Sequence, residues 1–537
     1  MRCFLILFFV GSGWAAEVRG LSREEVDEAA AEIDAGLEKV MRMEGERGIL
    51  KMPVEAADED FLRRLMVDVA GRLPTGSEVR EFLEDVDADK RAIWIDKVAA
   101  LPEAHRWRFR RLADALRVKD EVDGVSLRPY VEWLKGEVVE DVPYDGLVKR
   151  LLLAKGSMKE DPAAGYLLSD AGEVRQTVAE SMRALLGMDV QCAACHDDPF
   201  GDASQRQFYE LAGAFNRVVE GDGGKKLAEE PVPTRLPENY QYRNGSPGEL
   251  VKIAALPVSH FGDKLTGGEW KDGVRVALSE WMAGENNERF QEVAVFRVWQ
   301  WMFGQPLRVY NSVHRGMAAE TPDELVGTMN HCETLGRGLR SPMDIDWGTS
   351  DAHKEFWTLL RRQWDRCGRR MGEFQRVLAH TRAYQREVWV PSGDSIELNR
   401  FLPAPVLRRL PAEVVWDALA GWAGEKQAWL LPEVLPHGHP LRILGRGGRA
   451  WSDSDGGLMS HAVARFMMSG DLIKRATDSP VWGKIRGVED FFIEILGRMP
   501  TTGESQMAEA VVQANGGDGM QDVVWALLNT GEFWFLR

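Results

Sequence analysis

Cysteines, basic residues and long apolar runs are all scarce in this sequence. Only 5 cysteines occur among 537 residues, which excludes a disulfide-dense scaffold. After the first few positions no run approaches the roughly 18 apolar residues that span a bilayer, so we expect no transmembrane segment in the mature chain. The 67 basic residues are outnumbered by 84 acidic ones, for a net charge of −17. Without an overall positive field, the chain is not expected to bind nucleic acid.

Strand-like alternation of apolar and polar residues is also scarce, whereas helical periodicity recurs along the chain. Between residues 24 and 42 the apolar residues are spaced by three and four and form one stripe, made of Val26, Ala30, Ile33, Leu37 and Met41. A hydrophobic content of 44% over this length can bury several cores. The sequence therefore predicts a mainly α protein.

The N-terminus has the pattern of a signal peptide. A charged second residue precedes an apolar run over positions 3–10, and small residues lead to a cleavage site near position 15 or 16. A short buried helix is the alternative. We expect residues 1–16 to be removed and the mature protein to be secreted or periplasmic, with four cysteines left: Cys192, Cys195, Cys332 and Cys367.

Glycine and proline interrupt the helical pattern over one long segment. Two glycine pairs and five prolines occur between Val219 and Trp270, which favours irregular chain. We expect two helical modules, at 58–220 and 271–537, joined by an irregular Gly/Pro-rich connection at 221–270. Residues 17–57 are expected to form an N-terminal helix and a linker.

One eight-residue pattern occurs twice, as GRLPTGSE from Gly71 to Glu78 and as GRMPTTGE from Gly497 to Glu504. In each copy glycine ends a helix, proline blocks its continuation, and threonine with glutamate three residues later caps the next helix. The two copies are either an internal repeat or one good helix corner used twice. In both interpretations they predict structure rather than chemistry.

The most specific pattern in the chain is Cys192-Ala-Ala-Cys195-His196. Covalent haem attachment needs two thiols separated by two residues, one for each vinyl group, and a histidine beside the second thiol to bind the iron. We therefore expect one covalent haem c, with Cys192 and Cys195 on the porphyrin and His196 as the proximal iron ligand. Export agrees with this, because c-type haem is attached after translocation.

Apolar residues near the motif either line a haem pocket or form ordinary helix core; they are Leu185, Leu186, Phe200, Phe208, Tyr209 and Phe215. Three other chemistries use the motif itself. A thioredoxin-like redox pair usually lies in a βαβ unit, but the periodicity of this region predicts helices. A zinc site needs a fourth ligand, and a structural disulfide between Cys192 and Cys195 leaves His196 in solvent.

The sixth iron ligand is less well defined. Apart from His196, His260 is the only histidine between residues 188 and 282, and it is the first candidate for the distal position. Met188 is the second candidate. An open, five-coordinate iron would favour ligand binding or peroxide chemistry over electron transfer.

Other cysteines and histidines carry weaker signals. Cys332 and Cys367 either form a disulfide with each other or are two buried thiols. His437 and His439 flank one glycine, and they either bind a metal together or lie in a solvated loop.

Several segments resemble a known pair of domains. Residues 61–75, 192–200 and 205–209 look like the planctomycete-type cytochrome c-like domain, which places that domain at 58–220. Residues 286–290, 301–304, 381–385 and 527–533 are similar to its usual partner, a planctomycete-specific domain of unknown function, which takes 271–537. The resemblance implies a large exported protein with a haem-type motif, often found with machinery for polysaccharide breakdown. Where the family commonly has a second histidine two residues after the first, this chain has Asp198.

We therefore expect an exported c-type cytochrome-like protein that exchanges electrons with an unidentified redox partner. The alternative is a non-catalytic binding or scaffold protein at the cell surface or in the periplasm, associated with polysaccharide breakdown and without haem. A glycan-processing enzyme is a third hypothesis, but the acidic residues are too scattered to nominate a carboxylate pair.

Overall fold

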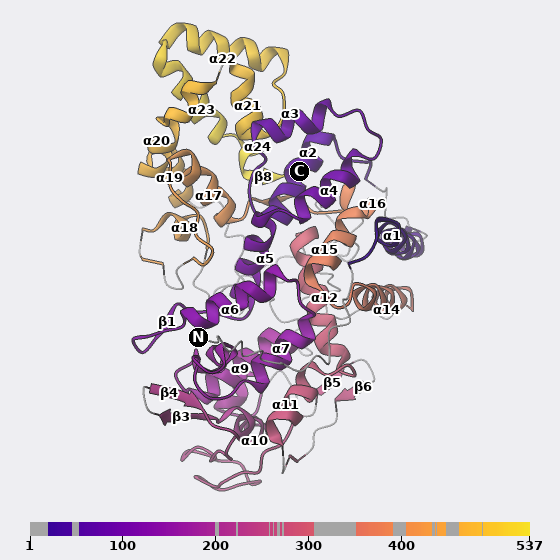
Figure 1. The fold of residues 1–537 in the computed structure, drawn as a ribbon, viewed down its shortest axis with the longest axis vertical. Helices are drawn as coiled ribbons and strands as arrows, with labels where there is room; N and C mark the ends of the chain where they lie inside the picture. Colours follow the sequence, from indigo (N-terminus) through magenta and orange to yellow (C-terminus); the bar gives the residue numbers. More distant parts are fainter. Residues whose placement is uncertain are drawn as a thin grey trace, which may run out of the picture.

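The computed structural model describes residues 20–45, 53–188, 190–198, 203–221, 224–256, 258–260, 263–265, 269–270, 273–304, 351–389, 404–431, 435–436, 438–446, 461–485 and 487–537. Helices dominate these residues, and their sheets have only two strands each (Figure 1). The prediction of a mainly α protein is confirmed.

The helices and helical turns before the motif are α1 (Arg23–Gly45), α2 (Asp58–Leu65), the π-helical turn η1 (Met66–Ala70), α3 (Gly76–Glu84), α4 (Lys90–Ala99), α5 (Pro102–Ala115), α6 (Arg128–Val139), α7 (Tyr144–Leu153), η2 (Pro162–Ala164), α8 (Gly165–Leu168) and α9 (Val174–Leu186). Those from the motif to residue 385 are η3 (Gln191–Ala194), α10 (Gln205–Phe215), α11 (Val274–Ala283), α12 (Glu288–Phe303), α14 (Asp351–Arg366), α15 (Met371–His380) and α16 (Arg382–Gln385).

The remaining helices are α17 (Ala412–Trp422), α18 (Pro440–Ile443), α19 (His461–Ser469), α20 (Asp471–Thr477), η7 (Pro480–Lys484), α21 (Val488–Leu496), α22 (Thr502–Asn515), α23 (Gly517–Leu528) and α24 (Gly531–Trp534). The strands pair antiparallel, as β1 (Glu121–Val122) with β2 (Val125–Ser126), β3 (Val218–Gly221) with β4 (Gly224–Leu227), β5 (Val258–His260) with β6 (Asp263–Leu265), and β7 (Arg408–Arg409) with β8 (Phe535–Leu536).

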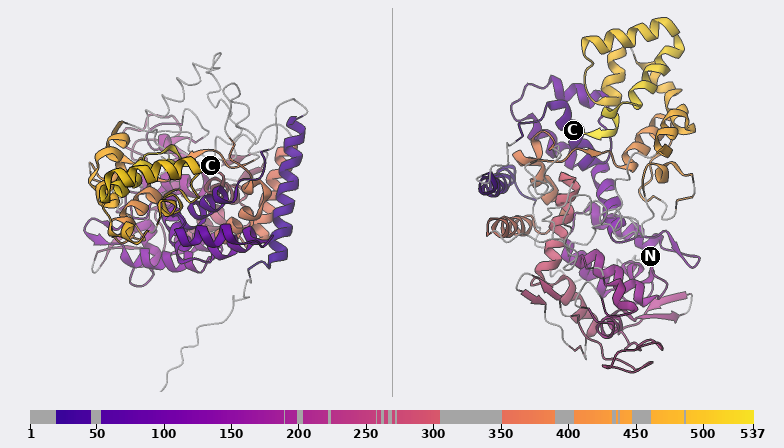
Figure 2. Two further views of the ribbon diagram at one scale, coloured as in Figure 1. Left: turned by 90° about the horizontal axis from the view of Figure 1, so that it is seen from above. Right: turned by 180° about the vertical axis from the view of Figure 1, so that it is seen from behind.

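The N-terminal helix α1 is amphipathic, as its periodicity predicts. Its apolar stripe from Val26 to Met41 is buried, and the helix packs against α14 and α15. Both views of the ribbon show α1 and α14 side by side at the edge of the molecule (Figures 1 and 2). On the polar side, ion pairs such as Glu28 with Arg366 and Glu32 with Arg362 join the two helices.

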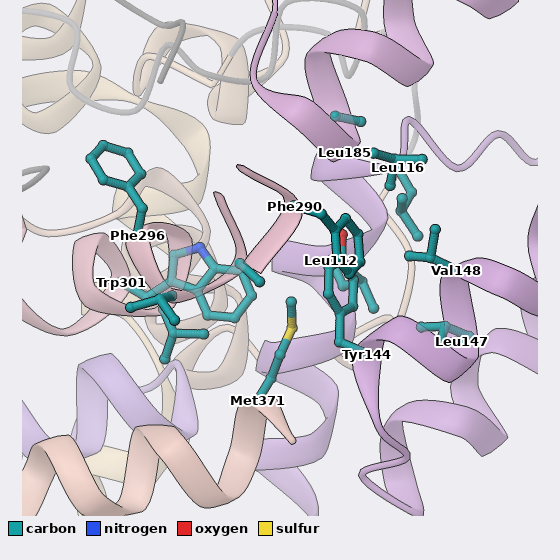
Figure 3. Close-up of a cluster of buried hydrophobic side chains, with 14 of the residues drawn as sticks. Leu112, Leu116, Tyr144, Leu147, Val148, Leu185, Phe290, Phe296, Trp301 and Met371 are labelled. Carbon is teal, nitrogen blue, oxygen red and sulfur yellow. The ribbon is translucent and has the colours of Figure 1, made fainter. Parts of the chain in front are cut away.

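The larger hydrophobic core takes side chains from both sides of the 221–270 connection. Leu112 of α5, Tyr144 of α7 and Leu185 of α9 lie close to Phe290 of α12 and Met371 of α15 (Figure 3). The rings of Tyr144 and Phe290 stack, with centroids 5.2 Å apart. The division into two modules remains a prediction from the sequence, while in the packing the helices of both modules share one core.

A second core is built mainly from α17 to α24, and the two cores exchange residues where they meet. Val67, Leu73 and Trp107 from the N-terminal part belong to the second core, and Ile493 of α21 belongs to the first. The C-terminus lies beside α2 (Figure 1), where Arg64 Nη1 donates a hydrogen bond to the carbonyl of residue 537 at 3.2 Å.

A buried polar network ties η1 to the chain after residue 380. Asp68 accepts a hydrogen bond from Tyr384 Oη at 2.9 Å and pairs with Arg408. Arg64 Nη2 donates to the backbone carbonyls of Tyr384 and Arg386, both at 2.8 Å. Burial raises the pKa of Asp68, although Arg408 and Tyr384 oppose this effect. Because Asp68 is paired with Arg408 and Arg64 donates to two backbone carbonyls, the network holds the segments in one arrangement.

The described part of the 221–270 connection has little regular structure, yet it is packed rather than loose. Two short hairpins and isolated bridges occur in it. Leu236, Tyr240, Val251 and Leu256 are buried in the larger core. Gly213 of α10 allows Ile253 to approach closely, so the connection covers one side of α10.

Both copies of the repeated pattern form the corner that the sequence predicts. Gly71 (φ 65°) and Gly497 (φ 77°) end their helices in the left-handed region, and capping boxes with Thr75 and Thr501 start α3 and α22. The arginine after each glycine forms a bidentate pair with the capping glutamate. The Nη2–Oε1 distance is 2.7 Å in both copies.

Candidate haem-attachment site

The motif lies in the corner between α9 and α10. Helix α9 ends at Gly187, whose left-handed backbone (φ 61°) lets the following N–H, that of Met188, donate to the Met182 carbonyl at 3.1 Å. Residues Gln191 to Ala194 then form the 3-10 turn η3, which contacts both α9 and α10. Helix α10 starts after a capping box made by Ser204 and Gln207. The amphipathic segment before the motif thus delivers the chain to a fixed turn.

Side chains of α10 hold the backbone of this turn. Gln205 Nε2 donates to the Cys195 carbonyl at 2.9 Å, and Tyr209 Oη donates to the Ala194 carbonyl at 3.3 Å. Ala193 is fully buried in the larger core, and a small side chain there lets the turn lie close to the helices. Side chains outside the motif therefore help to fix its backbone.

The three chemical groups of the motif occupy a single tight turn. The N–H groups of Cys195 and His196 both donate to the Cys192 carbonyl, at 3.0 and 3.1 Å. Cys192 is half-buried, and Cys195 and His196 are exposed. Cys195 is a free thiol, so the structural disulfide of the motif is not formed in this structure.

The imidazole of His196 is oriented by its own backbone. Its Nδ1 lies 2.8 Å from the Asp197 carbonyl oxygen. Because a carbonyl only accepts hydrogen bonds, Nδ1 carries the proton and Nε2 is the basic nitrogen. Iron-binding histidines in proteins commonly donate their second ring N–H to a carbonyl in this way. Among the described residues no three His, Cys, Asp or Glu side chains form a metal-binding group.

The segment after the motif is held by a residue that the sequence did not single out. The Asp197 N–H donates to Tyr242 Oη at 2.8 Å, and Asp197 Oδ1 accepts from the Gln205 N–H at 2.8 Å. Tyr242 comes from the irregular connection, about which periodicity says nothing. Only the fold of that connection over α10 brings it to the motif.

Residues 32–220 match one family model. That model, PSCyt2, is described as a protein of unknown function (DUF1549) and represents a planctomycete-type cytochrome-like domain. The match includes the whole motif and the first corner. No curated protein and no solved structure matches the chain. The similarity of 271–537 to the partner domain stays a prediction.

Within residues 32–220, the described apolar residues near the motif are buried. Leu185, Leu186, Phe208, Tyr209 and Phe215 are buried members of the larger core. The rings of Phe208 and Tyr209 meet edge to face, with centroids 5.7 Å apart. They pack the helices against each other, as ordinary helix core does. Phe200 lies outside the described residues.

The structure places the candidate sixth ligands differently. Met188 is buried in the larger core, where its thioether packs with apolar side chains. His260 is the last residue of β5, and its side chain lies outside the described part of the structure. Asp198, in place of the family's second histidine, donates its N–H to the Ala203 carbonyl at 2.9 Å and helps close the loop before α10.

His439 and Cys367, which carried weaker signals in the sequence, have structural roles in the described part of the chain. His439 caps α18, because its Nδ1 accepts from the Leu441 N–H at 3.2 Å, and it packs on the Trp416 ring. Cys367 is buried at the end of α14, and burial raises the pKa of its thiol. His437 and Cys332 lie outside the described residues, so the metal pair and the second disulfide stay predictions.

Residues 1–16 also lie outside the described residues, and the signal peptide stays a prediction. Across the ranges that the structure describes, no helix has the length and apolar character to cross a membrane.

Proposed function

We propose that this protein is an exported c-type cytochrome-like protein that carries one covalent haem at Cys192, Cys195 and His196 and exchanges electrons with a partner protein. The observation that carries the proposal is the motif itself, held in a single turn with Cys195 and His196 exposed. The match of residues 32–220 to a cytochrome-like family model supports it. Secretion or a periplasmic location follows from the predicted signal peptide, and association with polysaccharide breakdown follows from the resemblance alone.

The donor set fits this prosthetic group. Two thiols separated by two residues suit the two vinyl groups, and the adjacent imidazole presents a basic Nε2 for the iron. When bound, the haem iron supplies reversible one-electron transfer. The protein's own residues have positioning roles. The Asp197 carbonyl orients the His196 ring, while Gln205, Tyr209 and Tyr242 hold the backbone on which the thiols stand.

The decisive test measures the mass and the visible spectrum of the exported protein. The full chain, with its native N-terminus, is exported from a host with haem-attachment machinery, and the intact mass and reduced visible spectrum are recorded. We expect the mass of one haem added to a chain that starts near residue 16. The double variant Cys192→Ala/Cys195→Ala should be colourless, whereas Cys367→Ala, which removes a buried cysteine outside the motif, should keep the haem.

A colourless wild-type protein under these conditions would overturn the proposal. The alternative, a haem-free scaffold or binding protein, is favoured by one observation, namely that the apolar residues behind the motif already pack in the core. That alternative predicts an exported chain lighter by the two hydrogens of a Cys192–Cys195 disulfide. The same mass measurement therefore separates the two functions.

A further inference from the structure

A buried arginine with unused hydrogen-bond donors lies away from the motif, at the other end of α10. Arg217 follows the last turn of α10 and is 1% exposed. Its Nη2 donates to the Leu152 carbonyl at the end of α7, at 2.8 Å. Its Nε and Nη1 are buried and have no hydrogen-bond partner. Buried guanidinium donors are nearly always paired, so this side chain lacks a group that would accept from it.

A second arginine with the same deficiency lies on α11, the helix that contacts both α7 and α10. Arg275 is the second residue of α11, and its Nε and Nη1 are also buried without a partner. Helix α11 packs along α7, where Lys149 pairs with Glu280 at 2.8 Å. Burial and the positive charge of Arg275 lower the pKa of Arg217 to about 10, and the charge of the exposed Glu230 opposes this effect. Arg217 is therefore a cation at neutral pH, and its charge and that of Arg275 repel each other.

The start of α11 adds to the positive character of this place. The helix begins after Gly273, which has a left-handed backbone (φ 59°) and gives no side-chain cap. The first N–H groups of a helix attract anions, most strongly when no side chain caps them. Glu230 accepts no hydrogen bond from the Nε or Nη1 of either arginine. Two arginines with four unpaired donors and an uncapped helix start thus lie on neighbouring elements of the described structure.

We propose that Arg217 and Arg275 bind a small oxyanion at the start of α11, as inorganic phosphate or sulfate or as the carboxylate or sulfate group of a larger molecule. Guanidinium groups match oxyanions in geometry, and one anion would accept from both side chains and cancel their repulsion. Because Arg217 is almost fully buried and Arg275 is partly exposed, the anion enters from the Arg275 side. This site is independent of the haem.

The test measures anion binding by the mature full-length protein. Sodium phosphate, sodium sulfate and sodium acetate are titrated by calorimetry at an ionic strength held constant with sodium chloride, and the melting temperature is recorded alongside. We expect saturable binding of at least one of the three anions, with a higher melting temperature. In Arg275→Gln the dissociation constant should rise about tenfold or more, as expected when one charged hydrogen-bonding partner is lost.

Arg243→Gln is the matched control, because it removes one exposed arginine from the connection without touching the pair. Sulfate and phosphate also stabilise proteins non-specifically, but that effect is shared by all variants, so the difference between variants is the readout. Acetate binding alone would assign a carboxylate ligand, and phosphate or sulfate binding a tetrahedral one. Absence of saturable binding to the wild type, or unchanged binding in Arg275→Gln, would overturn the proposal. Since Arg217→Gln could fail to fold, the conclusion depends on Arg275→Gln.

Discussion

The corners at 71–78 and 497–504 share their local structure but not their surroundings. Each has a left-handed glycine, a capping box and an Arg–Glu pair. The first corner is enclosed where the two cores meet, and a Cβ on Gly71 would collide with the Trp107 ring. At Gly497 the nearest atom to such a Cβ is Pro74 Cγ, at 3.5 Å. The local sequence determines the conformation of each corner. The residues packed around the corner determine how much the stability of the protein depends on that conformation.

The largest effect should come from replacing the two glycines. Gly71→Ala combines a left-handed backbone with a clash against Trp107, and we expect it to lower the free energy of unfolding by about 3 to 5 kcal/mol. Gly497→Ala introduces the backbone strain alone, and we expect it to lower the free energy of unfolding by about 1 kcal/mol. Urea denaturation of the two variants measures both values. Equal losses would show that the surroundings do not matter.

The residue two positions after each glycine should give the next largest difference. Leu73 is 8% exposed and packs in the second core, whereas Met499 is 54% exposed. Leu73→Ala should lower the free energy of unfolding by about 2 to 3 kcal/mol, because it leaves a cavity. Met499→Ala should stay within about 0.5 kcal/mol. A loss at Met499 as large as that at Leu73 would mean that a partner covers the corner before α22 in solution.

The smallest effect should come from the charge of the capping glutamates. A hydrogen bond from Arg498 lowers the pKa of the Glu504 carboxyl from 4.5 to about 2. A carboxylate whose pKa is lower in the folded state stabilises above its unfolded pKa, and this stability is lost as the pH falls through the folded pKa. Glu504→Gln keeps a capping side chain and should cost about 1 kcal/mol at neutral pH.

That cost should shrink as the pH falls from 4.5 toward 2, because over this range the unfolded wild-type chain takes up a proton on Glu504 that the folded state, with its lower pKa, does not bind. Denaturation curves at several pH values measure the change. For Glu78, burial alone would raise the pKa, but the hydrogen bonds from Arg72 and Thr75 lower it overall, so Glu78→Gln should follow the same trend. Glu509→Gln, on the exposed side of α22, is the control. A pH-independent cost for Glu504→Gln would contradict the role of the ion pair.

Much of this structure could be predicted because its signals are local. The stripe of α1, the ends of helices at Gly71 and Gly497 and the capping boxes depend on residues a few positions apart, and the structure has each of them. The Cys192–His196 motif is also local, and its turn is described. The sharing of one core by α7 and α12 was not predictable, because periodicity shows that a helix has an apolar face but not which helix covers it.

The same limit applies to the site. Tyr242 reaches Asp197 only because the connection folds over α10, and nothing around position 242 marks it in the sequence. The unpaired donors of Arg217 and Arg275 also depend on contacts between distant helices. The motif differs from the corners in one respect. The corners use their side chains to hold their own shape, while Gln205, Tyr209 and Tyr242 from outside the motif help to hold its backbone.

The position of α1 has a consequence for synthesis of the chain. Its apolar stripe is covered by α14 and α15, and the ion pair between Glu28 and Arg366 joins residues 338 positions apart. As the chain grows from its N-terminus, this helix has no surface to cover it until most of the protein has been made. An early amphipathic helix without its partner is a target for chaperones and aggregation. Proteins cut short before α14 should therefore be captured or degraded, even when the motif is complete.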